Sequence, residues 1–183
     1  YMSPPLPVGG SLQTSDANNW VSVFSVSDYE VNPISAATYG LGALASFDGW
    51  LFWGTMHVPG TGAAAHESEL DEGIGFDLDD VLLSERSISI FRGRDFATTP
   101  EIDVLYGYPE MPVFNVTIGD WTYESNNLGQ DPIFGAPGFN NLLNNYTWTM
   151  EVYDDRLWVG TMDVGGLVAY GAGALTADLG GVE

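Results

Sequence analysis

A short motif that occurs twice constrains this chain more than any other feature. The first copy, Phe47–His57, reads FDGWLFWGTMH, and the second, Tyr153–Asp163, reads YDDRLWVGTMD. Leu, Gly, Thr and Met stand at the same offsets in both, and Leu51 corresponds to Leu157, a displacement of 106 positions. Such repetition indicates a fold assembled from recurring supersecondary units.

Each copy is predicted to fold as a β-hairpin. Its Asp-Gly or Asp-Asp pair suits a two-residue turn, because Gly, Asn and Asp tolerate the positive φ that such turns require. In the first hairpin, Ser46 then faces Leu51 and Leu44 faces Trp53, and aromatic residues on both faces indicate that both are covered. The pairs predicted for the second hairpin are Val152 with Leu157, Met150 with Val159, and Trp148 with Thr161.

The rest of the chain also reads as β-structure. The 23 glycines and ten prolines argue against long helices. Leu70–Leu83 is the best helical candidate, but Gly73 and Gly75 interrupt it, so we expect a loop there, with one turn of helix at most. Further runs with strand-like alternation are Trp20–Val26, Ile88–Phe91, Ile102–Tyr106, Trp148–Tyr153 and Leu167–Tyr170.

The hairpin pattern of an aromatic residue, Asp-Gly, any residue, then Leu-aromatic-x-Gly-Thr resembles the inner strands of a bacterial β-propeller blade. The resemblance covers residues 39–57, 87–114 and 146–163. It implies an all-β fold with antiparallel four-stranded sheets, in which Ile88–Arg94 and Ile102–Gly107 supply outer strands and Trp20–Val26 supplies the outer strand of a preceding blade. Long loops would span 59–83 and 119–138.

The expected organisation is a single β-rich domain or fragment over residues 1–183. Its approximate repeat units are 31–137 and 138–183, the second incomplete, and the Gly- and Ala-rich end, Gly165–Glu183, is expected to hold the strand Leu167–Tyr170 followed by a weakly ordered tail. WD and kelch signatures are lacking, and a closed propeller needs more blades than this chain holds. We therefore expect a piece of a larger β-propeller protein, with a β-sandwich as the alternative.

Charge narrows the possible partners and surroundings. The chain has 25 acidic residues, four arginines and no lysine, for a formal net charge of −21. The negative field repels nucleic acid and anionic membranes. We interpret the charge as an adaptation to a salty or acidic medium, and the alternative is an ordinary acidic surface that needs no special medium. Cysteine is absent, which excludes disulfides and thiolate chemistry. No run is long and apolar enough to span a bilayer, and a start at Tyr1 fits a processed or trimmed chain, so we expect a secreted or cell-surface location.

A few side chains are candidates for binding. His57 and Asp163 occupy the same motif position, where a propeller strand end would face the central channel or its mouth, although both could be ordinary exposed residues. Trp158 points away from its apolar neighbours and is expected to be exposed. Arg92 and Arg94 share a strand face and could grip an acidic partner or neutralise Asp95 and Glu101.

Metal binding has weaker support. Asp77, Asp79 and Asp80 could offer oxygen ligands to calcium, against the alternative of a solvated acidic loop. His66 lacks the second histidine of a zinc-binding His-Glu-x-x-His helix. No other cofactor is indicated.

Catalytic signatures are absent from the sequence, since there is no nucleophile elbow and no phosphate-binding loop with lysine. We therefore predict a non-catalytic extracellular module, structural or protein-interacting, whose partners are other proteins or the remainder of its own chain. A polysaccharide-acting propeller hydrolase or lyase is one alternative. A calcium-dependent carbohydrate-binding domain is another.

Overall fold

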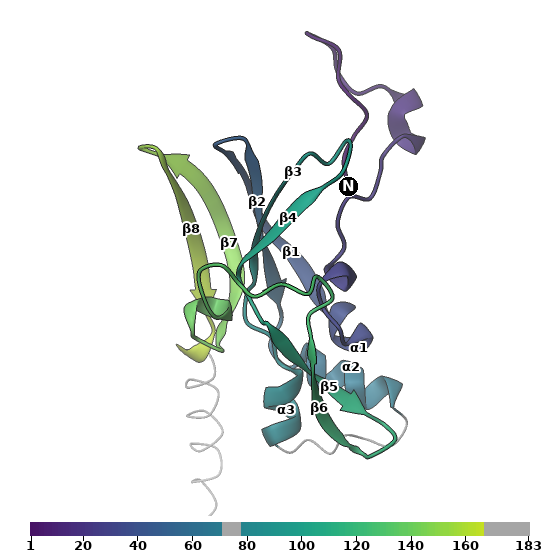
Figure 1. Cartoon of the computed structure of the whole chain (residues 1–183), viewed down its shortest axis with the longest axis vertical. Coiled ribbons are helices and arrows are strands. Elements are labelled where there is room, and N and C mark those ends of the chain that lie inside the picture. Colours follow the sequence, from purple (N-terminus) through teal and green to yellow (C-terminus); the bar gives the residue numbers. More distant parts are fainter. Residues whose placement is uncertain (71–77, 167–183) are drawn as a thin grey trace, which may run out of the picture.

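The structure is a computed structural model that describes residues 1–70 and 78–166 (Figure 1). The described part is mostly β, as expected for an all-β fold, with short helices near the base of the view in Figure 1. Its strands are β1 (Tyr39–Phe47), β2 (Trp50–His57), β3 (Ile90–Arg94), β4 (Glu101–Tyr106), β5 (Glu110–Asn115), β6 (Asp120–Ser125), β7 (Asn144–Tyr153) and β8 (Arg156–Asp163). Its α-helices are α1 (Pro33–Ala36), α2 (Thr61–Glu69) and α3 (Leu78–Ser84), and 3-10 turns span Thr14–Asn18, Val26–Asp28 and Pro137–Phe139.

Four consecutive strands form an antiparallel meander in the order β1, β2, β3, β4. Strands are found where the runs Ile88–Arg94 and Ile102–Gly107 were predicted, as β3 and β4. A separate two-stranded sheet, β5 with β6, lies below the meander and beside α2 and α3 in Figure 1.

The β7–β8 hairpin leans against the meander. Figure 1 shows the two units joined at the lower end and diverging upward in a V. A single residue pair, Met56 with Tyr146, connects β2 to β7. The two motif copies therefore lie side by side although they are far apart in sequence.

Apolar side chains fill both sides of the meander. Tyr29, Trp53, Phe91, Val104 and Met111 form a buried cluster on one side. On the other side, Phe52, Ile90, Leu105 and Met150 form a second cluster, and the last of these comes from β7. Both faces of the first hairpin are thus covered as predicted, apart from Leu41 and Leu44 of β1, which are exposed.

Several expectations about the connecting segments are wrong. Trp20–Val26 is no strand: Val21 makes one isolated bridge with Met2, and a 3-10 turn begins at Val26. The expected loop 59–83, for which one turn of helix was expected at most, contains α2 and most of α3, and Ala63–Ala65 favour helix in the first of these. The expected loop 119–138 contains β6, which pairs with β5 over its whole length. Leu167–Tyr170 and nearly all of the expected tail lie outside the described residues.

None of the helices within residues 1–70 and 78–166 combines the length and the hydrophobicity needed to cross a bilayer.

Candidate functional site

Both motif copies form the predicted hairpins, which we call the first hairpin (β1–β2) and the second hairpin (β7–β8). Their turns are alike: Asp48 and Gly49 have φ of 49° and 76°, and Asp154 and Asp155 have φ of 52° and 53°. The predicted pairs Leu44 with Trp53, Ser46 with Leu51, Met150 with Val159 and Val152 with Leu157 are all present.

The two hairpins also share an irregularity that the sequence did not reveal. Each skips register at the same place, between Leu41 and Leu44 in the first hairpin and between Thr147 and Thr149 in the second. The extra residue moves Trp148 out of the predicted pair with Thr161, which faces Thr147 instead. Trp148 therefore corresponds in position to Gly42, and Gly160 corresponds to Gly54.

Small residues let the two hairpins approach closely. A Cβ atom on Gly54 would stand 2.3 Å from the hydroxyl oxygen of Thr147, and one on Gly42 would stand 2.6 Å from its carbonyl oxygen. Thr147 is only 1% exposed. Beside this contact, Met150, Leu157 and Val159 of the second hairpin pack with Phe52, Ala45 and Phe47 of the first. We call this contact the hairpin interface.

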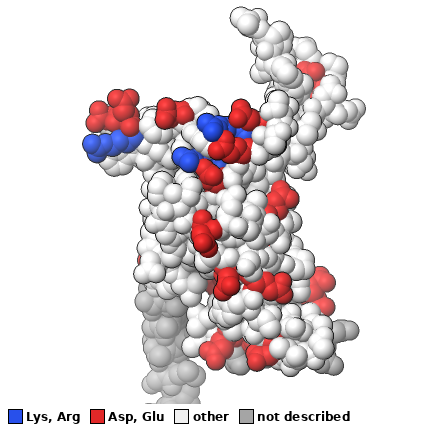
Figure 2. All heavy atoms as spheres, in the orientation of Figure 1, with Lys and Arg blue, Asp and Glu red and all other residues white. Residues whose placement is uncertain are grey.

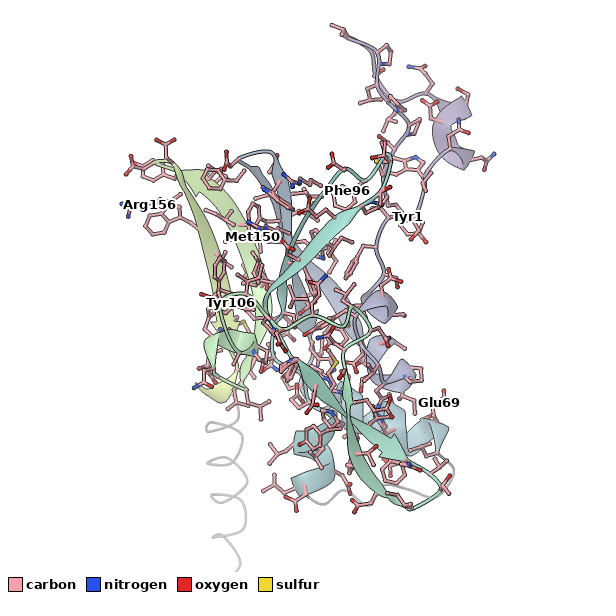
Figure 3. All side chains as sticks on the ribbon, viewed as in Figure 1. Tyr1, Glu69, Phe96, Tyr106, Met150 and Arg156 are labelled. Carbon is pink, nitrogen blue, oxygen red and sulfur yellow. The ribbon has the colours of Figure 1, made fainter. Side chains whose placement is uncertain are left out.

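Figure 3 places Met150 on the β7 strand facing the meander, within the hairpin interface. Toward the open end of the V, an apolar cleft of about 390 Å³ separates the two units. Phe52 and Leu105 line it from one side and Leu157 and Val159 from the other. The interface is therefore tight at Thr147 and looser toward the turns.

The equivalent face of the second hairpin has no such cover among the described residues. It carries Trp148, Tyr153 and Trp158, which correspond to the covered positions Gly42, Phe47 and Phe52. Their exposed fractions are 66%, 71% and 55%. The predicted exposure of Trp158 is confirmed, and its indole Nε1 donates to the carbonyl oxygen of Tyr153 at 3.0 Å, which fixes the ring. We call these three side chains, with Gly160, the outer face.

A second apolar cleft, which we call the groove, lies beside the first hairpin. Its volume is about 570 Å³, and it runs between the N-terminal segment and the first hairpin. Leu41, Leu44 and Trp53 form one wall, while Phe24 and Phe96 belong to the other; Figure 3 labels Phe96 and Tyr1 there. Leu41 and Leu44 are 63% and 48% exposed, whereas their equivalents Thr147 and Met150 are buried in the hairpin interface.

A buried ion pair joins the base of the meander to the helices. Arg86 and Glu30 have fully buried side chains, with Nε and Oε2 2.8 Å apart. The remaining guanidinium hydrogens are donated to the carbonyl oxygens of Leu83, Glu85 and Pro112 and to a second contact with Glu30. Burial alone would lower the pKa of Arg86, but the Glu30 carboxylate outweighs burial and raises it. Removal of either partner would leave the other charge buried and unpaired, so the fold depends on the two residues together.

His57 is not at a channel mouth or in solvent, so both predicted settings for it are wrong. It is fully buried, and both of its ring nitrogens are within hydrogen-bonding distance of other side chains. Its Nδ1 lies 3.0 Å from Oε1 of Glu85, and its Nε2 lies 2.7 Å from the hydroxyl of half-buried Thr38. Asn145 donates to the same Glu85 oxygen at 3.1 Å.

The Thr38–His57–Glu85 chain has the order of groups found in hydrolase triads, but its surroundings favour a structural role. The Thr38 hydroxyl also donates to the carbonyl of Ser35 at 2.7 Å, so its single hydrogen cannot serve His57 as well. None of the three side chains lines either cleft described above. A substrate therefore has no described route to them.

His66 is a second buried histidine that the sequence did not single out as structural. Asn32 accepts two backbone N–H bonds through Oδ1, which directs its amide Nδ2 to donate to Nε2 of His66 at 2.8 Å. The other ring nitrogen lies 2.8 Å from the carbonyl of Gly62. Burial lowers the pKa of His66, more strongly than the Gly62 hydrogen bond raises it.

The remaining predicted site residues do not converge. The guanidinium carbons of Arg92 and Arg94 each lie 4.2 Å from the centroid of the Trp50 ring, so the two arginines share one strand face as predicted. They pair with Asp103 and Glu101, each with a nitrogen–oxygen distance of 2.7 Å, and Asp95 lies 3.9 Å from Arg94, which agrees with the neutralising role. Figure 2 shows basic side chains beside acidic ones at the upper end of the molecule.

Asp163 and the acidic residues near α3 lie elsewhere. Asp163 accepts hydrogen bonds from the backbone N–H of Gly165 and the amide of Asn141, which lower its pKa. Asp80 accepts from the indole nitrogen of Trp121 at 2.9 Å, Asp79 is exposed, and Asp77 lies outside the described residues. Within residues 1–70 and 78–166, no three His, Asp or Glu side chains come together as metal ligands would.

In comparisons with protein families, curated proteins and solved structures, no match to this chain was found.

Proposed function

We propose that this chain is a non-catalytic structural and protein-interaction module of a larger extracellular protein or assembly of β-propeller type. One observation carries the proposal: the outer face exposes Trp148, Tyr153 and Trp158, while the corresponding face of the first hairpin is covered by protein. Adjacent exposed aromatic side chains of this size are typical of interaction surfaces.

A propeller hydrolase or lyase is less well supported by the geometry. Carboxylates, an arginine and His57 around one accessible pocket would support it, since glycosidases act through a pair of carboxyl groups. Glu85 and His57 do meet, and Glu30 and Arg86 lie in the same interior region, but all four are buried. The two clefts are lined mainly by apolar side chains.

Carbohydrate binding is the second candidate, because Trp148 and Trp158 could stack on sugar rings as readily as on a protein. The calcium-dependent form of this alternative requires that the ion stabilise the folded state, which would raise the unfolding temperature as calcium is added. A fluorescence titration with soluble polysaccharides, with and without EDTA, tests both properties at once.

The surroundings we propose are salty rather than acidic. A net charge of −21 makes the folded chain repel itself unless salt screens it. Acid would relieve the same repulsion, but it would also protonate His66, whose present hydrogen bonds require the neutral ring.

The native mass of the protein isolated from its source tests the proposal directly. A particle much larger than 19.7 kDa, the mass of this chain, is expected whether the chain is part of a longer polypeptide or of an assembly. A free species of 19.7 kDa that degrades a polysaccharide would replace our proposal with the enzyme.

A further inference from the structure

We propose that the outer face of the second hairpin binds the apolar groove of a second copy of this chain, in a head-to-tail arrangement. This inference rests on the proposed function and names the partner of the same surface. It follows from the hairpin interface, in which one hairpin of this motif already covers another.

The motif correspondence specifies which residues would meet. Within the chain, Thr147 contacts Gly42 and Gly54. We replace each residue of this contact by its equivalent in the other motif copy. Leu41 of a second chain then takes the place of Thr147, and it meets Trp148 and Gly160 of the first chain in place of Gly42 and Gly54. By the same shift, the packing of Met150 against Phe52 predicts that Leu44 of the second chain meets Trp158.

Leu41 and Leu44 are the residues that such a contact needs to be accessible. They are the exposed part of the first hairpin, although their equivalents are buried. The N-terminal segment covers Trp53 deeper in the groove but leaves these two leucines uncovered. Part of the surface that the correspondence requires is therefore available, whereas Trp53, the equivalent of Val159, is already covered.

The proposed contact between chains differs in shape from the hairpin interface within the chain, and the groove has room for the difference. At Gly42 the backbones approach so closely that no side chain fits, and Trp148 replaces this glycine in the second hairpin. Trp148 therefore keeps a second chain farther away than the hairpins are from one another. An open groove of about 570 Å³ provides room for the protruding indole.

Charge permits this contact once salt is present. No side chain that lines the groove carries a formal charge. Figure 2 shows most acidic side chains near the top of the molecule and around its base, with a few on the middle of the visible face. Repulsion between two chains is therefore mainly long-range, and it is screened within about 3 Å at 1 M salt.

Disulfide trapping tests the arrangement, since the native chain has no cysteine. Ala45 and Met150 belong to one cluster within the chain, so their equivalents Glu151 and Leu44 should meet between chains. We would mix Glu151→Cys with Leu44→Cys at micromolar concentration in molar NaCl. Because thiols held in a complex have an effective concentration in the millimolar range, we expect the mixed dimer to form on the order of 100-fold faster than in a mixture of Glu124→Cys with Leu44→Cys.

Three results would overturn the inference. One is equal trapping with Glu124→Cys, an acidic position on β6 outside both surfaces. Another is rapid trapping by either variant alone, which would indicate a symmetric contact instead. The third is sedimentation of the native chain as a monomer at all salt concentrations, with no change on Trp158→Ser. If the chain stays monomeric while the protein from its source is large, the module proposal stands and only the choice of partner is wrong.

Discussion

Removing the Arg86 side chain should cost more stability than any other single change to a charged residue of this chain. Arg86→Met leaves the Glu30 carboxylate buried, with only the Tyr39 hydroxyl and the backbone N–H of Asn32 to accept from. It also leaves the carbonyls of Leu83, Glu85 and Pro112 without their donor.

The magnitude follows from that loss. Breaking a buried ion pair by removing one partner costs about 3–5 kcal/mol. A domain's total stability is about 5–15 kcal/mol, so the variant should retain only part of it. With a urea slope of about 2 kcal/mol/M, the unfolding midpoint should fall by about 2 M.

Urea unfolding in molar NaCl, followed by tryptophan fluorescence, measures the effect. Arg156→Met is the matched control, because Arg156 is exposed at a hairpin turn, as Figure 3 shows, and should change stability by at most about 0.5 kcal/mol. The double variant Glu30→Gln/Arg86→Met should cost less than the sum of its single changes, because it leaves no buried unpaired charge. A loss below about 1 kcal/mol for Arg86→Met would refute the reasoning.

Three further predictions concern other parts of the fold. Gly54→Ala should destabilise the fold by about 1–3 kcal/mol, since its methyl group would clash with Thr147. Urea unfolding checks this, and Gly49→Ala serves as the comparison, because it strains a turn without a clash. Asp155→Gly should raise stability by up to about 1 kcal/mol, because its φ of 53° suits glycine better, and an unchanged or lower unfolding midpoint would contradict this. Because the pKa of His66 is lowered in the folded chain, the unfolded chain binds a proton on this residue more readily, and stability should fall as pH drops below about 6.5. Thermal unfolding at a series of pH values checks this, and His66→Gln should weaken the loss of stability at low pH.

Local features of the hairpins were predictable from the sequence. The turns at Asp48 and Asp154 and the pairing of Val152 with Leu157 depend on neighbouring residues alone, so the Asp-Gly pattern and the alternation were sufficient. The register skip at Trp148 was not predicted, because strict alternation places Trp148 opposite Thr161 and does not mark the extra residue.

The buried charges were missed for the same reason. Glu85 and Arg86 follow an acidic stretch that reads as solvated loop, and only the tertiary fold brings them to His57 and Glu30. His57 ends a strand, which suggests exposure until the following helices are placed. Trp158 was predicted well because a single face of one hairpin decides its exposure.

The surroundings of Arg86 also bear on the order in which the chain folds. Its carboxylate partner Glu30 lies 56 residues earlier, and its acceptor Pro112 lies 26 residues later. During synthesis the guanidinium must therefore stay hydrated until residue 112 has emerged, because desolvating it earlier would leave a donor unsatisfied. Closure of the base is thus a late, long-range step, and it couples the N-terminal segment, the meander and β5 into one cooperative folding unit.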